Sequence, residues 1–128
     1  MSSFFKSDLV IDTLNTNGDV SINGDLTVTG DTTTVSTTNT VVSDKLLELA
    51  NGTTGTPSGD AGVVIERGSS NNVFIGWDES EDKVTVATGT FTGASTGDLS
   101  LTDAALKTGA ITASGDISTT GEVKTAKV

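Results

Sequence analysis

Apolar residues follow a six-residue rhythm in two parts of the chain. In residues 17–22 and 23–28, a polar residue, Gly and Asp are followed by an apolar residue, Ser or Thr, and a second apolar residue. Residues two apart lie on the same face of a strand, and Gly beside Asn or Asp favours a turn. Each hexad therefore predicts a short strand with one apolar face and a tight corner.

The rhythm returns in residues 92–128, where glycines keep the spacing from Gly97 to Gly121 and Asp103 fills one glycine slot. A period of six with glycine at corners is typical of triangular β-helical structures. Each block holds too few hexads for a self-sufficient solenoid. We therefore expect an intertwined homotrimer, β-prism-like, in which each chain supplies one side and strand edges are removed. The expected trimer core consists of apolar hexad positions: Val20, Ile22, Leu26, Val28, Leu99, Leu101, Ile111, Ile117 and Val123.

The middle of the chain has a different pattern. Residues 50–62 combine four glycines with the only proline and predict a loop. Three short runs rich in β-branched residues follow, separated by turn residues, and predict an antiparallel meander. Trp77 is expected in its core or at a subunit contact. The expected strands cover residues 62–68, 73–78 and 83–88.

The fold class expected from these patterns is all-β, with two hexad-repeat blocks flanking the small meander. Residues 41–49 are expected to form a strand, with a helical turn as the alternative, and residues 103–107 could form a helical turn. Glu66 and Arg67 are expected to form a salt bridge across strands or between subunits. The sequence is expected to divide into an extended segment over 1–16, a repeat block over 17–49, the loop and meander over 50–91, and a repeat block over 92–128. In the first segment, Phe4 and Phe5 are a candidate anchor into a partner or, alternatively, a cap over the first β layer.

Composition narrows the function classes. Only 34% of residues are hydrophobic and 4% aromatic, which suits thin β layers that other chains complete. A net charge of −10 disfavours nucleic acid as a partner. Histidine and cysteine are absent, which removes the usual zinc ligands and nucleophile–base pairs. No targeting segment is recognised, and no apolar run approaches the roughly 18 residues of a membrane span. We expect no enzyme activity, no cofactor or metal, and no membrane insertion.

Acidic residues offer the remaining candidate chemistry. Asp19, Asp25 and Asp31 recur every six residues and could line up as calcium ligands, but we expect each to cap its own glycine turn. Four acids in residues 78–82 could serve glycoside hydrolysis as paired carboxylates. Because they are adjacent in a tight turn, a solvated hairpin tip is the favoured interpretation.

Two stretches resemble a known class of protein. Residues 5–14, together with the Gly-Asp-Leu-Thr-Val-Thr-Gly hexads, are similar to modules of fibres and other virion structural proteins of tailed phages, notably marine phages and cyanophages. The same holds for Gly-Asp-Ala-Gly-Val-Val-Ile-Glu-Arg-Gly-Ser at 59–69, which continues into 73–79. The spacing from Ile-Glu-Arg-Gly to Trp77 is the more specific part.

The resemblance implies a homotrimeric, β-rich component of the particle exterior, made in the host cytoplasm. We therefore expect a non-enzymatic virion structural protein of the tail-fibre type. Its expected partners are itself and other proteins of the tail or capsid, with the host cell surface as a further candidate. Such fibres are usually longer and carry a receptor-binding head that is not recognised here. The alternative is a capsid decoration protein that stabilises the head shell.

Overall fold

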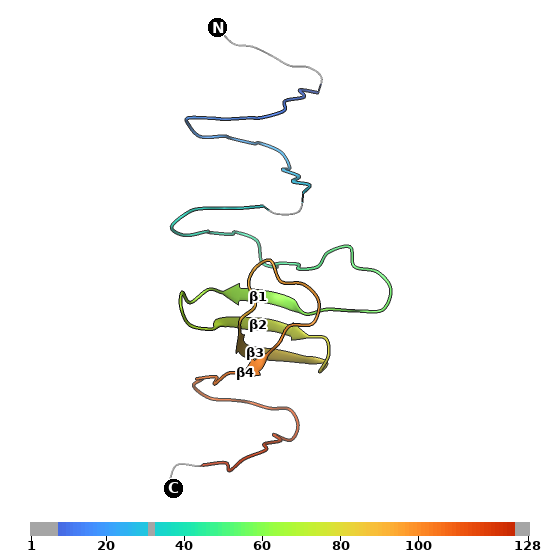
Figure 1. Ribbon diagram of the computed structural model, residues 1–128, viewed down its shortest axis with the longest axis vertical. Helices are drawn as coiled ribbons and strands as arrows, with labels where there is room; N and C mark the ends of the chain where they lie inside the picture. The colour runs from blue at the N-terminus through green and yellow to red at the C-terminus, as the bar shows by residue number, and fades with distance from the viewer. Residues whose placement is uncertain (1–7, 31–32, 125–128) are drawn as a thin grey trace. The chain divides into compact units, whose positions relative to one another are not determined.

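The computed structural model describes residues 8–30 and 33–124, and in this part of the chain it contains strands but no helix. Four strands form one antiparallel sheet in the order β1-β2-β3-β4 (Figure 1). The all-β prediction is confirmed, and so is the antiparallel meander in the middle of the chain. The strands are β1 Ala61–Ile65, β2 Asn72–Asp78, β3 Lys83–Gly89 and β4 Thr102–Asp103.

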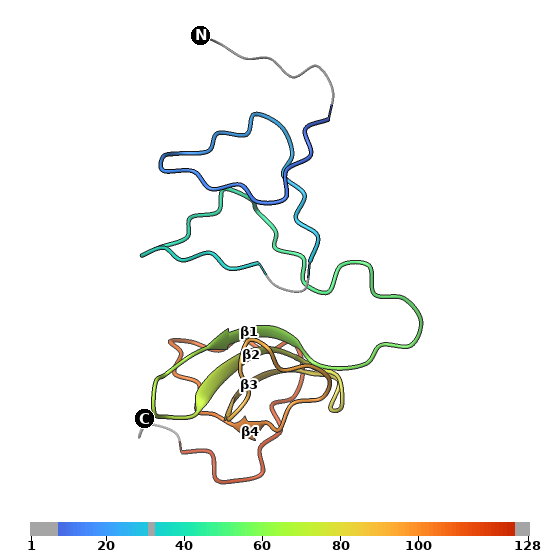
Figure 2. The same cartoon turned by 45° about the horizontal axis from the view of Figure 1, so that its top comes forward.

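The chain divides into two units, Met1–Ser43 and Asp44–Val128. The described residues of the first unit run as extended segments joined by corners (Figures 1 and 2). None of the short strands expected there forms within the single chain, nor does the strand expected over 41–49. A strand exists only through pairing, and the described residues of this unit form no backbone–backbone hydrogen bond with one another. The described residues from 105 onward likewise contain no strand.

Short connections set the register of the sheet. Ile65 pairs with Val73 at the β1–β2 connection, and Asp78 pairs with Lys83 at the β2–β3 turn. Asp82 closes this second turn with a left-handed φ of 53°, a conformation that Asp tolerates better than most residues. The helical turn considered for residues 103–107 is wrong. Its first residue lies instead in β4, which pairs with the end of β3.

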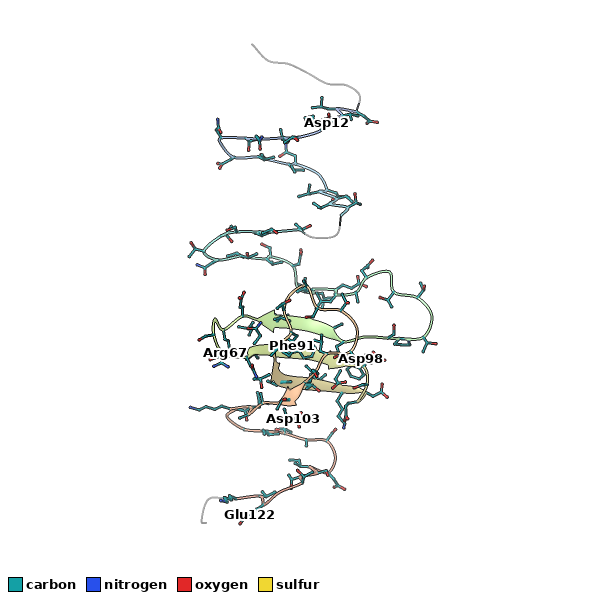
Figure 3. The ribbon with its side chains drawn as sticks, in the orientation of Figure 1. Asp12, Arg67, Phe91, Asp98, Asp103 and Glu122 are labelled. Carbon is teal, nitrogen blue, oxygen red and sulfur yellow. The ribbon has the colours of Figure 1, made fainter. Side chains whose placement is uncertain are left out.

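The buried side of the sheet is built around Phe74, whose side chain is 2% exposed. Its ring lies over Gly62 and Gly76, which face each other across β1 and β2. A Cβ on Gly62 would lie 2.6 Å from this ring, so the two glycines make the space that the ring fills. Phe91 packs edge-on against Phe74, with ring centroids 6.0 Å apart and an interplanar angle of 74°. Figure 3 shows Phe91 beside the strands.

Residues 90–101, the cover loop, lie over this side of the sheet (orange in Figures 1 and 2). Asp60, just before β1, anchors the loop. One carboxylate oxygen of Asp60 accepts the Leu99 N–H at 2.8 Å, and the other accepts the Glu79 N–H at 2.9 Å. The Asp60 N–H donates to the Gly97 carbonyl at 3.1 Å. One residue thus joins the chain before β1, the β2–β3 turn and the cover loop.

The opposite end of the cover loop is fixed by Asn72. Its Nδ2 donates to the Phe91 carbonyl at 2.8 Å, while its Oδ1 accepts the Arg67 N–H at 3.1 Å. Both halves of the Asn72 amide are therefore satisfied. Together, Asn72 and Asp60 hold the cover loop against one side of the sheet.

Candidate functional site

The other side of the sheet is apolar and has no cover. Because side chains alternate along a strand, the observed register places nine uncharged residues on one face. Val63, Ile75 and Val84 on this side are 50%, 45% and 76% exposed. We call this surface the open face: Ala61, Val63, Ile65, Val73, Ile75, Trp77, Val84, Val86 and Thr88.

Trp77 lies on the open face and is 41% exposed. The prediction that it belongs to the core of the meander is wrong for the single chain. Phe74 is three residues earlier in β2 and therefore points to the opposite side. The cover loop encloses the side of Phe74, which leaves the indole uncovered. The alternative, that Trp77 lies at a subunit contact, stays a prediction.

The apolar hexad positions expected in the trimer core fall into two groups. Seven are exposed, with exposed fractions between 49% and 69%. Leu99 and Leu101 are half-buried because they belong to the cover loop of their own chain. Phe4 and Phe5, the candidate anchor, lie outside the described residues. The seven exposed positions are Val20, Ile22, Leu26, Val28, Ile111, Ile117 and Val123.

Six of the glycines that mark the hexads are not required by the single chain. Around these six, an added Cβ would meet no heavy atom within 4 Å. None of the six has a positive φ, whereas Gly52, Gly59 and Gly97 in loops do. Neither local space nor backbone conformation therefore explains why these positions are glycine. The six are Gly18, Gly24, Gly30, Gly109, Gly115 and Gly121.

Threonine, not aspartate, forms side-chain hydrogen bonds at the hexad corners. Thr16 Oγ1 donates to the Gly18 carbonyl at 3.1 Å, and Thr119 Oγ1 donates to the Gly121 carbonyl at 3.0 Å. The side chains of Asp19 and Asp25 form no hydrogen bond with other described residues, so the predicted capping role is not observed for them; Asp31 lies outside the described residues.

Among the residues that the structure describes, no three acids converge on a common metal position.

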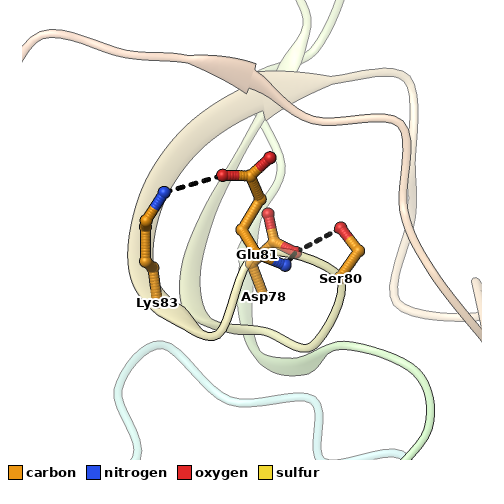
Figure 4. A network of polar contacts seen from close by, with 4 residues as sticks. All are labelled: Asp78, Ser80, Glu81 and Lys83. Atoms are coloured by element: carbon orange, nitrogen blue, oxygen red, sulfur yellow. Dashed lines mark hydrogen bonds and ion pairs between the residues drawn. The ribbon is translucent and has the colours of Figure 1, made fainter.

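The acids of residues 78–82 form the β2–β3 turn (Figure 4). Asp78 is buried, and its carboxylate accepts hydrogen bonds from Ser80 Oγ at 2.7 Å and the Glu81 N–H at 3.1 Å. Glu81 pairs with Lys83 at 2.8 Å on the surface. The hydrogen bond and charge of Glu81 raise the pKa of Lys83 above its ordinary value of 10.5. Two of the four acids thus stabilise the turn itself.

Arg67 lies in the turn between β1 and β2, at the end of the sheet away from Asp98 (Figure 3). Its Nη1 donates to the Asn71 carbonyl at 3.3 Å, and it forms no salt bridge with Glu66 or another described residue of the chain. The predicted bridge within the chain is wrong, because the strand ends at Ile65 and the following residues belong to the turn.

Two shallow hollows also occur in the second unit. One, of about 320 Å³, follows the β1–β2 turn, and its only acid is Glu66. The other, of about 200 Å³, lies beside the cover loop, and its only acid, Asp60, already accepts two N–H groups. Neither hollow brings together the paired acid and base that hydrolysis requires.

No protein-family model, curated protein or solved structure matches this chain. Within the described ranges, no helix has the length and apolarity needed to cross a membrane. Exposed apolar side chains occur at the hexad positions and on the open face of the described part of the chain.

Proposed function

We propose that this chain is a non-enzymatic structural protein of a tailed-phage particle, assembled as a homotrimer of the fibre type. One repeat block precedes the sheet in the sequence and the other follows it. In the proposed trimer, each block forms triangular β layers with the same block of the other two chains. The chain acts by assembly, with itself and with neighbouring proteins of the tail or capsid on the exterior of the particle.

The observation that carries the proposal is the lack of partners for the hexads inside the chain. Apolar side chains repeat in phase and remain about half to two-thirds exposed. The backbone around them is extended but unpaired in the described part of the first unit. Unpaired extended backbone with an apolar face is a template for pairing with another chain. Identical chains can pair their hexads in register, because each copy has the same six-residue spacing.

The hexad glycines support the same arrangement. Glycine allows two backbones to approach closely, and the empty space around these residues in one chain is where a neighbouring copy would lie.

The direct test is the mass of the protein in solution, measured by analytical ultracentrifugation of the wild type and two variants. Gly24→Val is expected to reduce the trimer to a monomer, because the added side chain occupies the space of a neighbouring copy. Gly93→Val is the control, since an added Cβ at Gly93 also meets nothing within 4 Å but the residue lies in the cover loop. A wild-type monomer would refute the homotrimer.

The place in the particle is tested by electron microscopy of phage that carry a tagged copy. Label along the tail or its fibres supports the fibre-type role. Label on the head shell would replace it with the decoration role, which the assembly surfaces also allow.

A further inference from the structure

The open face has the size and composition of a contact surface. Its large side chains span three neighbouring strands and include no charged residue. Val63, Ile65, Ile75, Trp77 and Val84 are between 41% and 76% exposed, so together they form an apolar patch on the order of a few hundred Å². The largest apolar patch of a typical monomer is about 300–600 Å² and is often functional. The open face is a patch of this size and is therefore a candidate contact surface.

The absence of charge on the open face permits a second copy to pack against it. Each chain carries a net charge of −10, so copies repel one another unless the surfaces that meet are neutral. The open face meets this condition, because the charged residues of the meander lie in its turns and on the covered side. The covered side is already occupied by the cover loop of the same chain, held by Asp60 and Asn72. Of the two faces of the sheet, the open face is therefore the one available to another molecule.

The area also indicates how this contact forms. A standard interface buries about 800 Å² on each partner, so an apolar patch of a few hundred Å² is too little for a stable complex of sheets alone. Repeat blocks flank the sheet in sequence on both sides, and their association raises the effective concentration of one sheet for another. A modest apolar face is then sufficient to hold the sheets of different copies together.

From these observations we infer that the open faces of three copies pack together on the trimer axis, with Trp77 buried between subunits. This inference rests on the proposed homotrimer and adds a contact that the hexads do not include. It assigns the meander a direct role in assembly, as a closed three-sided apolar core.

Trp77 is the only tryptophan, so fluorescence reports on this contact alone. In the native trimer, the emission should be shifted to the blue and acrylamide quenching should be largely lost, compared with the monomeric Gly24→Val variant. Ile75→Lys places a charge on the open face, where solvent accepts it in the single chain. It is expected to separate the three sheets and make Trp77 quenchable again, while the hexads keep the chains trimeric and the far-ultraviolet circular dichroism of the sheet is retained.

A milder variant avoids dependence on a disruptive substitution. The chain has no cysteine, so Ile75→Cys introduces a single thiol on the open face. On oxidation, covalent dimers should form, because three thiols around an axis can make only one disulfide. Ser69→Cys, in the exposed β1–β2 turn, is the control and should remain uncrosslinked.

The outcomes separate this inference from the proposed function. A trimer in which Trp77 stays fully quenchable and Ile75→Cys does not crosslink would overturn the inference and leave the homotrimer intact. A trimer whose open face becomes protected only when another virion protein is added would overturn it as well. A wild-type monomer would overturn both.

Discussion

Asp60→Asn tests the central anchor of the fold. Asp60 accepts two backbone N–H groups, from Glu79 and Leu99, that belong to different parts of the chain. Hydrogen bonds to a charged group contribute about 1.5–3 kcal/mol each. Because the carboxylate is only half-buried, we use the lower value, about 3 kcal/mol for the pair. Asparagine keeps one neutral acceptor and turns its amide N–H₂ toward the other donor, so the expected loss is about 2 kcal/mol.

The measurement is urea unfolding, followed by circular dichroism at one fixed protomer concentration, since association also contributes to apparent stability. Amide hydrogen exchange gives a local readout. Protection of the Glu79 and Leu99 amides should fall by about 5- to 30-fold. Asp98→Asn is the matched control, because Asp98 is exposed in the same loop and its substitution should change stability by less than about 0.5 kcal/mol.

The reasoning fails if Asp60→Asn unfolds at the same urea concentration as Asp98→Asn. It also fails if the protein is destabilised but exchange at the two amides is unchanged, since the loss would then arise elsewhere.

Three further substitutions test other parts of the structure. Gly76→Ala should destabilise the sheet by about 1–3 kcal/mol in urea unfolding, because its Cβ would meet the facing strand and the ring above it; Gly93→Ala, with open space, should not. Ala50→Gly should stabilise by about 1 kcal/mol, since Ala50 has a φ of 57°; no gain in thermal melting would contradict this. Glu81→Gln should return the raised pKa of Lys83 toward 10.5, as measured by NMR titration. Because the pKa of Lys83 is raised in the folded state, the Lys83–Glu81 pair contributes fully to stability below pH 10.5, and this contribution is lost as the pH rises above that value. The stability of the protein should therefore not depend on this pair between pH 5 and 8. An unchanged Lys83 titration in the variant would exclude Glu81 as the cause of the raised pKa.

The meander could be predicted from the sequence because alternation and turn residues are local signals. Val84 and Val86 alternate with polar neighbours, and the turns on both sides are rich in polar residues. The faces could not be assigned in the same way. Phe74 and Trp77 are both aromatic and lie on opposite sides of β2, and only the position of the cover loop decides which is buried.

The position of the cover loop could not be predicted from the sequence for a related reason. The hexad at 96–101 has the same pattern as the hexad at 23–28, but Leu99 and Leu101 are half-buried whereas Leu26 and Val28 are exposed. The difference is the carboxylate of Asp60, which lies 39 residues before Leu99. No periodic signal reports such a partner. The expected strands of the repeat blocks do not form within the single chain, and their pairing between copies belongs to the proposed trimer.

The distance between Asp60 and Leu99 along the chain has a consequence during synthesis. The three long strands are complete once Gly89 has been added, and their hairpins are local enough to form within microseconds. The Leu99 amide follows ten residues later, so Asp60 first holds only the β2–β3 turn. At 5–20 residues per second, this interval lasts about one second. During that time Phe74 lacks its cover, and the nascent sheet exposes apolar surface on both sides to chaperones and proteases.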